Sequence, residues 1–313
     1  MSKLLSILIP TYNRCVDLEK NLNLLDDLIS KINIFKDIEI IISNNKSNDN
    51  TINVVEQFIN KSSVDIQFYN QDENIGLEKN ALYVLEKSSS EYIMYLGDDD
   101  FINKEYLFEV VEKIKYRKDI SCIIPSFHNV LPNGKIHSSR DIEFENKFYV
   151  KGINNCIQNS WRGHQLSGVV HLRENLLESY HNNNVSNIYL FIYFVAYNCI
   201  RGTTYHFTSC PIHISHISQD KKDWDYGKDG LLNEIFDNYN KLDVSYFVKL
   251  KLQLKQLKVQ KQRYMKDNIF ESAKIVLNII NNKNTFIIVK LLFPSLFIYY
   301  FLRQKISKIR HIG

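Results

Sequence analysis

Residues 91–100 read EYIMYLGDDD, a largely apolar run that passes through one glycine into three consecutive aspartates. The apolar run predicts a strand over residues 91–96 that is buried on both faces of a sheet. Asp98, Asp99 and Asp100 follow directly after it. Adjacent like charges repel one another and favour a counter-cation, and hard carboxylate oxygens suit magnesium or manganese. The stretch therefore predicts an acidic, metal-binding loop at the end of a buried strand.

The aspartates also allow a less specific interpretation. Acidic turns are common, and an Asp can cap a helix, here one that begins near Asn103. The position directly after the fourth predicted strand favours a functional site, because ligands of open parallel sheets bind at the carboxyl ends of the strands.

The sequence around this stretch alternates two periodicities. Short apolar runs predict three earlier strands, over residues 4–9, 37–42 and 64–69. Apolar residues at helical spacing predict helices between them, over residues 18–29, 51–59 and 77–85. This alternation predicts an α/β fold with a mostly parallel central sheet and helices on both faces.

The second half of the chain is less regular. Residues 121–126 predict one more strand, and from there to about residue 215 the pattern is irregular and rich in Asn, His and Tyr. Residues 243–272 are rich in Lys, Leu and Gln and predict helix, and residues 286–302 are strongly apolar. We expect one domain over residues 1–220 and a helical region over residues 221–313.

Composition excludes several classes of protein. The chain has 313 residues, of which 44% are hydrophobic and 24% charged, which is a globular composition. Ten glycines and five prolines argue against collagen-like or turn-dense all-β folds. Five cysteines without a CxxC pair favour neither disulfides nor a zinc knuckle, so a reducing compartment fits best. Residues 1–14 lack a small-residue cleavage site and predict a buried strand rather than a secretory signal.

The net charge of +4 is unevenly distributed. After Glu271 there are no acidic residues and seven basic ones, so residues 1–271 carry about three more acidic than basic groups. The excess positive charge belongs to the tail. This pattern argues against a protein that coats nucleic acid and predicts a local anionic partner.

The loops after the predicted strands lack the common phosphate-binding signatures. There is no GxGxxG after the first strand and no GxxxxGK[ST] in the chain, so neither a dinucleotide fold nor a P-loop is favoured. A nucleotidyltransferase normally presents a glycine-rich, basic loop after its first strand, and that loop is missing here. A phosphate ligand would have to be held another way, and a metal ion supplies one.

Several segments in order resemble the nucleotide-sugar-binding half of family 2 glycosyltransferases with the Rossmann-like GT-A fold. They are SILIPTYNR at residues 6–14, IEIIISNNKSNDNT at 38–51 and ENIGLEKNALYVLEKSSSEYIMYLGDDD at 73–100. The resemblance covers about the first 125 residues, and HQLSGVVHLRE at 164–174 resembles the strand that follows in such enzymes. It implies a glycosyltransferase that uses a nucleotide-diphosphate sugar, usually with inversion, and a divalent ion at an Asp-x-Asp motif. Residues 1–125 would bind the donor and residues 126–220 would face the acceptor.

The resemblance also implies donor-binding residues. They are Pro10, Thr11 and Tyr12 with Arg14 nearby, Asn44 and Asn45, Asn74, Gly76, Lys79 and Asn80, and Asp98 with Asp99. Asn44 and Asn45 stand where the family often has two aspartates that contact uracil. Amides can also accept and donate hydrogen bonds to a base. A UDP-sugar is the expected donor, with thymidine, cytidine and guanosine nucleotides left open.

The same resemblance places the metal and leaves the catalytic base open. We expect Asp100 as a ligand of Mn²⁺ or Mg²⁺ and Asp98 as a ribose or metal contact, with His213 or His216 as a further candidate ligand. Many relatives have Asp at the position of Gly97. The family's base often lies in an acidic pair ahead of a helix, and no such pair precedes residues 188–196. The remaining candidates for the base are Glu174, Glu178, Asp223 and Asp225.

The apolar and basic pattern of the C-terminal residues 284–310 predicts contact with a membrane. The apolar run over residues 286–302 is shorter than the roughly 20 residues that cross a bilayer, and Lys290 and Pro294 interrupt it. Its basic flanks are typical of a segment, here residues 284–310, that lies among anionic headgroups. A buried helix is the alternative. We expect a cytoplasmic enzyme, peripheral at the inner face of the cell membrane, that extends a glycan or lipid-linked saccharide of bacterial surface polysaccharide and binds no nucleic acid.

One alternative function remains at this level. Amides at Asn44 and Asn45, glycine at Gly97 and the missing acidic pair are also compatible with a catalytically silent nucleotide-sugar-binding or scaffold protein.

Overall fold

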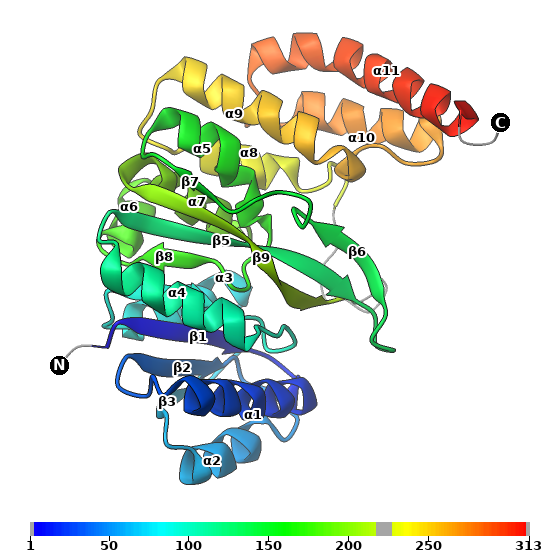
Figure 1. Cartoon of the computed structure of the whole chain (residues 1–313). Helices are drawn as coiled ribbons and strands as arrows, with labels where there is room; N and C mark the ends of the chain where they lie inside the picture. The colour runs from blue at the N-terminus through cyan, green and yellow to red at the C-terminus, as the bar shows by residue number, and fades with distance from the viewer. Residues whose placement is uncertain (1–2, 217–226, 311–313) are drawn as a thin grey trace. The chain divides into compact units, whose positions relative to one another are not determined.

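The computed structural model describes residues 3–216 and 227–310 (Figure 1). The chain divides into two compact units, Met1–Ser218 and Gln219–Gly313.

The first unit is built on one sheet. Its strands within residues 3–216 are β1 (Leu5–Thr11), β2 (Ile38–Asn44), β3 (Asp65–Asn70), β4 (Tyr92–Tyr95), β5 (Ile120–Val130), β6 (Ile136–Arg140), β7 (Lys147–Tyr149), β8 (Val170–Leu172) and β9 (Thr203–Ser215). They lie in the order β3-β2-β1-β4-β8-β5-β9-β7, and β6 pairs with β5. The strands β3, β2, β1 and β4 are parallel to their neighbours, as the sequence predicts. β8 runs antiparallel to both β4 and β5, so the second half of the sheet is mixed.

Helices cover both faces of this sheet (Figure 1). They are α1 (Cys15–Ile32), α2 (Thr51–Lys61), α3 (Leu77–Lys87), α4 (Lys104–Tyr116), α5 (Ile153–Asn159), α6 (Leu176–Asn182) and α7 (Leu190–Arg201), with a 3₁₀ turn, η1 (Ser160–His164). Alternate strand residues point to opposite faces. Ile7 belongs to the buried cluster formed with α1, α2 and α4. Tyr95 faces the other layer, where it donates to the Ala81 carbonyl of α3 at 2.8 Å and its ring meets Phe191 of α7. The predicted α/β fold with flanking helices is confirmed.

The region from residue 126 to 215 differs from the expected irregular pattern, because it contains β6 to β9 and α5 to α7. The longest of these strands, β9, has 13 residues and carries polar side chains that are nevertheless buried. Thr204 bonds Asn155, His206 lies 3.2 Å from Asp141, and Thr208 donates to a backbone carbonyl. Apolar periodicity does not reveal a strand whose buried face is polar and satisfied by hydrogen bonds.

The second unit is helical in its described residues. It contains α8 (Leu232–Asn240), α9 (Tyr246–Val259), a 3₁₀ turn η3 (Lys261–Arg263), α10 (Ile269–Asn281) and α11 (Ile287–Arg310). The helix expected over residues 243–272 is therefore divided between α9 and α10. α11 continues through Pro294 for 24 residues rather than stopping there.

One buried side chain in the sheet gives a measurable pH dependence. His171 on β8 is fully buried, and its Nδ1 lies 3.2 Å from Asn198 Nδ2. Burial, with a smaller effect from nearby Arg201, lowers the pKa of His171 to about 3. Folded His171 is therefore neutral at pH values where an exposed histidine takes up a proton.

We expect His171→Gln to weaken the acid dependence of stability. The unfolded chain binds a proton at His171 near pH 6.5 that the folded chain does not bind until about pH 3, so stability rises with pH between these values. Lowering the pH from 7 to 5 should reduce the unfolding free energy of the wild type by about 2 kcal/mol more than that of the variant. Denaturant unfolding at both pH values measures the difference. Equal losses in the two proteins would contradict this assignment.

Candidate active site

The loops that follow β1, β2 and β4 meet at one edge of the sheet. The carboxyl ends of neighbouring parallel strands lie together, and here Thr11 pairs with Asn44. The Thr11 carbonyl accepts from the Asn45 amide at 2.9 Å, and the Thr11 hydroxyl donates to Asp98 Oδ2 at 2.7 Å. Segments that are far apart in sequence, around residues 11, 45 and 98, thus form one site.

Arg14 lies against the first two aspartates. Its Nη1 donates to Asp99 Oδ2 at 2.6 Å, and its Nε is 3.7 Å from Asp98 Oδ1. Asp98 is only 7% exposed, so this cation offsets part of the charge in a poorly hydrated place. The sequence predicts Arg14 near the donor site, and the structure places it on the acidic loop.

Asp100 is held by donors from the second half of the unit. Its Oδ1 accepts from the Ser215 backbone amide at 2.8 Å at the end of β9. Its Oδ2 accepts from Gln165 Nε2 at 3.2 Å and from the Ser167 hydroxyl. The Asp100 carboxylate therefore joins the loop after β4 to β9 and to the segment after η1. Gln165, Ser167 and Ser215 are site residues that sequence reasoning missed, because they are ordinary polar residues in the half without a legible pattern.

The surroundings of the acidic loop disfavour the charged form of its carboxyl groups. Burial, followed by repulsion from Asp99, raises the pKa of both Asp98 and Asp100 to about 7. Burial also raises the pKa of Asp99, while Arg14 opposes that shift. A further positive charge beside the loop would favour the charged carboxylates.

The oxygen ligands available here suit a magnesium or manganese ion whose coordination shell also includes substrate oxygens. The oxygens of Asp98, Asp99 and Asp100 are hard ligands of the type that these ions prefer. In the part of the chain that the structure describes, no three His, Cys, Asp or Glu side chains converge to hold a metal ion by themselves. Magnesium is commonly bound through one or two carboxylates together with substrate phosphates. The site fits that mode better than an all-protein cage.

The two candidate histidines lie beside the loop at the end of β9. His213 and Phe101 exchange backbone hydrogen bonds of 2.8 Å, so the aspartates and β9 are adjacent. The imidazole of His213 neighbours that of His128, and burial lowers its pKa. The ring of His216 stacks on His137 with the ring centroids 4.2 Å apart. Their role as metal ligands stays a prediction.

Asn44 and Asn45 are buried and connect two loops. Asn44 Nδ2 donates to Asn70 Oδ1 at 2.7 Å, and Asn45 Nδ2 donates to Asn74 Oδ1 at 2.9 Å. Asn45 Oδ1 in turn accepts from the Ile75 amide at 2.8 Å. Carboxylates could not make the two donated bonds. The hydrogen bonding therefore accounts for amides at positions where the family often has aspartates.

The segment that leads into α3 combines a special backbone with an exposed cation. Gly76 has a φ of +84°, which favours glycine, and its amide donates to Asn74 Oδ1 at 2.9 Å. Lys79 is exposed in the first turn of α3. Asn80 is buried and bonds Ser43 of β2. Pro10 and Tyr12 are partly buried in the segment around the end of β1. The residues implied by the resemblance therefore line one edge of the sheet.

Gly97 has a steric reason to be glycine here. A Cβ at this position would lie 2.9 Å from Asp100 Oδ2 and 3.2 Å from the Ser167 hydroxyl oxygen. The Gly97 amide also donates to that hydroxyl at 2.9 Å. An aspartate at this position would displace the bonds that orient Asp100.

None of the described candidates for the base touches the acidic loop. Arg173 donates to the Glu91 carbonyl, so Glu174 lies where β4 begins, at the opposite edge of the sheet from Asp98. Glu178 is exposed on α6. Asp223 and Asp225 lie outside the described residues. Just ahead of α7 stands buried Asn187, whose Oδ1 accepts from the Tyr189 amide at 3.0 Å.

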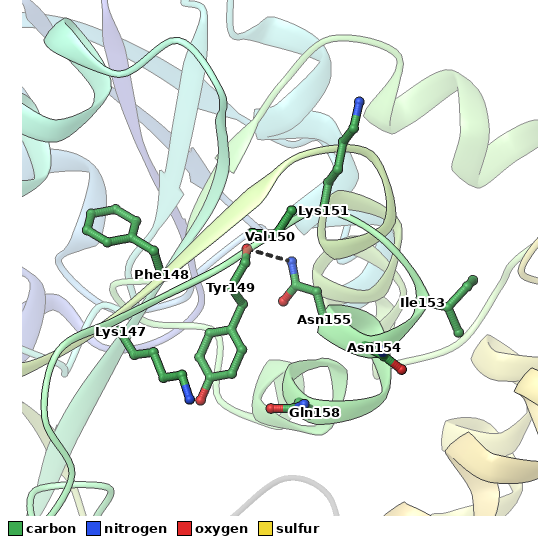
Figure 2. A pocket seen from close by; sticks show the side chains of 9 residues that line it. All are labelled: Lys147, Phe148, Tyr149, Val150, Lys151, Ile153, Asn154, Asn155 and Gln158. Carbon is green, nitrogen blue, oxygen red and sulfur yellow. Dashed lines mark hydrogen bonds between the residues drawn. The ribbon is translucent and has the colours of Figure 1, made fainter.

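A separate cavity of about 480 Å³ lies between β7 and α5, with Lys147, Tyr149, Lys151 and Gln158 among the side chains that line it (Figure 2). β7 pairs with the beginning of β9, at Thr204, whereas the aspartates bond the far end of β9, at Ser215. The cavity is therefore distinct from the acidic site.

Comparisons with known proteins agree with this geometry. A profile of the family described as "Glycosyl transferase family 2" matches residues 6–168. The chain is 33% identical over 109 residues to the GalNAc(5)-diNAcBac-PP-undecaprenol beta-1,3-glucosyltransferase of Campylobacter jejuni. That match covers 35% of this chain and 34% of the relative, so it spans about a third of the relative's length.

Solved structures show the same fold. S. aureus TarS 1-349 in complex with UDP-GlcNAc superposes with a TM-score of 0.63 at 15% identity, covering 89% of this chain and 80% of that one. The mannosyltransferase PcManGT from Pyrobaculum calidifontis in complex with GDP-Man and Mn2+ gives a TM-score of 0.53 at 11% identity, covering 95% and 81%. The predicted GT-A type of fold is confirmed.

One site residue that the sequence analysis missed is Asn21. It interrupts the apolar stripe of α1 between Leu18 and Leu25, and such a buried amide is the signal that could have found it. Its Nδ2 donates to the carbonyls of Gly97 and Asp100, each at 2.9 Å. Asn21 therefore fixes the backbone of the acidic loop.

We expect Asn21→Ala to lower the unfolding free energy by roughly 1–3 kcal/mol, because two buried carbonyls lose their donor. Asn23→Ala is the matched control, since Asn23 is exposed on the same helix and donates to Glu19 within it. The control should change stability by less than about 0.5 kcal/mol. Chemical denaturation of both variants measures the difference, and equal effects would show that Asn21 does not support the loop.

Proposed function

The chain belongs to glycosyl transferase family 2, and on that premise we propose that it transfers a sugar from a nucleotide-diphosphate donor, with UDP the expected nucleotide, to a saccharide acceptor. The observation that carries the proposal is the convergence of Thr11, Arg14 and Asn45 with Asp98–Asp100 at one edge of the sheet. Ligands of open α/β sheets bind at this edge.

Asp100, with Asp98 as a further contact, would hold a divalent ion together with the donor phosphates. When bound, such an ion supplies positive charge against the charge that develops on the leaving diphosphate. Arg14 lies against Asp98 and Asp99, and exposed Lys79 adds a cation at the start of α3. The positive end of the α3 dipole favours an anion at the same place. These groups orient the diphosphate and stabilise its departure.

The other half of the reaction concerns the acceptor hydroxyl. Inversion requires this hydroxyl to attack the sugar from the face opposite the diphosphate and to lose its proton to a base. Of the candidates, Glu174 is at the wrong edge of the sheet for this role, which leaves Glu178, Asp223 and Asp225. The Campylobacter jejuni relative is named for a saccharide on undecaprenyl diphosphate. We propose a lipid-linked saccharide of bacterial glycan synthesis as the acceptor here.

We further propose that α11 brings the enzyme to the membrane that carries such an acceptor. Residues 287–304 are long and apolar enough to cross a bilayer by length and composition, and 17% of this window is buried. Val289, Phe293 and Phe297 are buried along one stripe of the helix. The exposed side is also apolar, with Ile287, Ile288, Leu291, Leu292, Ile298, Tyr299 and Leu302.

A helix that packs one stripe on protein and exposes another apolar stripe suits a position in the plane of the interface. Basic Lys283 and Arg303 flank it and favour an anionic surface. We therefore place the protein at the cytoplasmic face of the membrane, as a peripheral enzyme.

The acidic loop is tested by Asp98→Asn, which keeps the size of the side chain and removes its charge. We expect turnover of a UDP-sugar in the presence of Mn²⁺ to fall by about 10²–10³-fold. The variant would hold the ion less well, and the ion supplies the positive charge that stabilises the leaving diphosphate. Asp27→Asn, on the exposed side of α1 in an ion pair with Lys31, is the control and should keep wild-type turnover. Release of UDP, measured with and without Mn²⁺, is the readout.

Two results would contradict the proposal. One is unchanged turnover in a folded Asp98→Asn variant. The other is a wild type that binds the nucleotide sugar but turns over none of several UDP-, GDP-, TDP- and CDP-sugars, which would favour the catalytically silent alternative.

The membrane contact is tested by the double variant Leu291→Glu, Ile298→Glu. Both side chains are more than half exposed, so the substitution spares the core that deletion of the helix would remove. We expect binding to vesicles that contain phosphatidylglycerol to fall by at least about tenfold, because two anchors are lost. Phe108→Glu on α4, at 49% exposure, is the control. Flotation measures binding, and extraction of the bound wild type by alkaline carbonate separates a peripheral helix from a spanning one.

A further inference from the structure

The η1 turn presents two stacked aromatic rings next to the acidic site. The rings of Trp161 and His164 are nearly parallel, at 9°, with centroids 5.9 Å apart. Gln165, the next residue, donates to Asp100. Both aromatic residues are partly exposed. These two rings therefore belong to the short segment that, through Gln165, is bonded to the acidic loop.

A buried charge network packs against the Trp161 ring. Arg162 Nε lies 2.7 Å from Asp141 Oδ2, and its Nη1 donates to Asn159 Oδ1 at 2.9 Å. The Arg162 guanidinium carbon is 4.7 Å from the Trp161 ring centroid. Arg140 donates to the Arg162 carbonyl and lies 5.9 Å from the same ring. Two guanidinium groups thus lie close to the same indole ring.

Burying this charge network stabilises the fold no better than apolar side chains often would. Burial lowers the pKa of Arg140 to about 9, and the surrounding cations together with His206 hold the pKa of Asp141 well below its usual range. Asp141 also has a φ of +62°, in the left-handed region. Buried ion groups of this kind are often no more stable than apolar packing, and strained backbone tends to collect at functional sites. Because both guanidinium groups of the network lie over the Trp161 ring, the network also restricts where that ring can lie.

The indole is also tied to its own turn. Trp161 Nε1 donates to the Gln158 carbonyl at 2.9 Å, and His164 Nδ1 lies 3.0 Å from the Trp161 carbonyl. The polar edge of the ring is therefore satisfied by backbone, and the part of the ring that His164 and the two arginines do not cover is open to contacts. A rigid ring of this kind loses little conformational entropy when a ligand stacks on it.

We propose that Trp161 and His164 form a saccharide subsite, in which a pyranose of the acceptor packs its C–H face on the indole beside the donor. The inference rests on the proposed function, because the acceptor role follows from the position next to Asp100. A sugar ring offers an apolar face and polar edges, and an indole with a satisfied N–H offers the matching apolar surface. A nucleobase could stack on the same ring, and the experiments below separate the two ligands.

The direct test uses tryptophan fluorescence in the full-length chain. The sequence has two tryptophans, Trp161 and Trp224, so Trp224→Phe leaves Trp161 as the sole indole. We titrate this variant with maltose, lactose and chitobiose, with sorbitol as the polyol control. The subsite is supported if at least one disaccharide shifts the emission maximum to the blue and weakens quenching by acrylamide, while sorbitol does neither. No change with any disaccharide, or a shift produced by UDP alone, overturns it.

The kinetic test compares Trp161→Leu with Trp161→Phe, using p-nitrophenyl glycosides as acceptors and a UDP-sugar as donor. We expect Trp161→Leu to raise the acceptor KM by about tenfold, and Trp161→Phe to restore most of the loss because it retains a ring. The dissociation constant for UDP should stay at the wild-type value in both variants. Tyr116→Leu, which removes an aromatic ring that is 71% exposed on α4, is the control.

The outcomes separate the subsite from the proposed function. An acceptor KM that stays unchanged in Trp161→Leu, while the wild type transfers sugar, overturns the subsite alone. A raised dissociation constant for UDP in Trp161→Leu also overturns it, because the ring would then serve the nucleotide. A wild type without UDP binding or transfer overturns the proposed function, whereas the fluorescence titration still decides whether Trp161 binds sugars.

Discussion

The structure of the first unit depends on keeping three adjacent carboxylates at the poorly hydrated end of β4. Burial penalises the charged form of Asp98 and Asp100 strongly enough to raise the pKa of each to about 7. The chain compensates with donors to the carboxylates from several elements: Thr11 at the end of β1, Arg14 after it, Ser167 after η1 and Ser215 at the end of β9. Asn21 of α1 holds the backbone of the same loop. These bonds join the two halves of the sheet around the loop. The acidic loop is therefore a place where the two halves of the unit are bonded to each other, in addition to the pairing of β4 with β8.

Amides play a comparable connecting part in the loops after β2 and β3. Asn44 and Asn45 each donate to another asparagine, and so join the loop after β2 to the one after β3. Aspartates at these positions would repel one another and could not donate. Asn44 and Asn45 therefore connect these two loops without adding negative charge to them.

The first half of the fold could be read from the sequence because its core is apolar. Runs such as IEIII in β2 and the stripe Leu18, Leu22 and Leu25 on α1 show their period directly. The acidic loop was legible for the same reason, since charge after a buried strand stands out. β9 was not legible, because Thr204, His206 and Thr208 are buried by virtue of partners far away in sequence. Gln165 and Ser215 were missed likewise, since only the three-dimensional contacts give these common residues a role, whereas Asn21 had a signal in its interruption of the apolar stripe of α1.

The same reasoning distinguishes two kinds of buried polarity in the second half. In β9 the polar groups satisfy one another and close the sheet, so a strand results. Around Asp141 the groups exceed that need, because Arg140 and Arg162 bring two cations to one carboxylate and both approach one indole. Buried ion groups of this kind are often no more stabilising than apolar side chains of the same size. Because both guanidinium groups also lie over one indole, the network has a second effect besides packing: it restricts the position of the Trp161 ring.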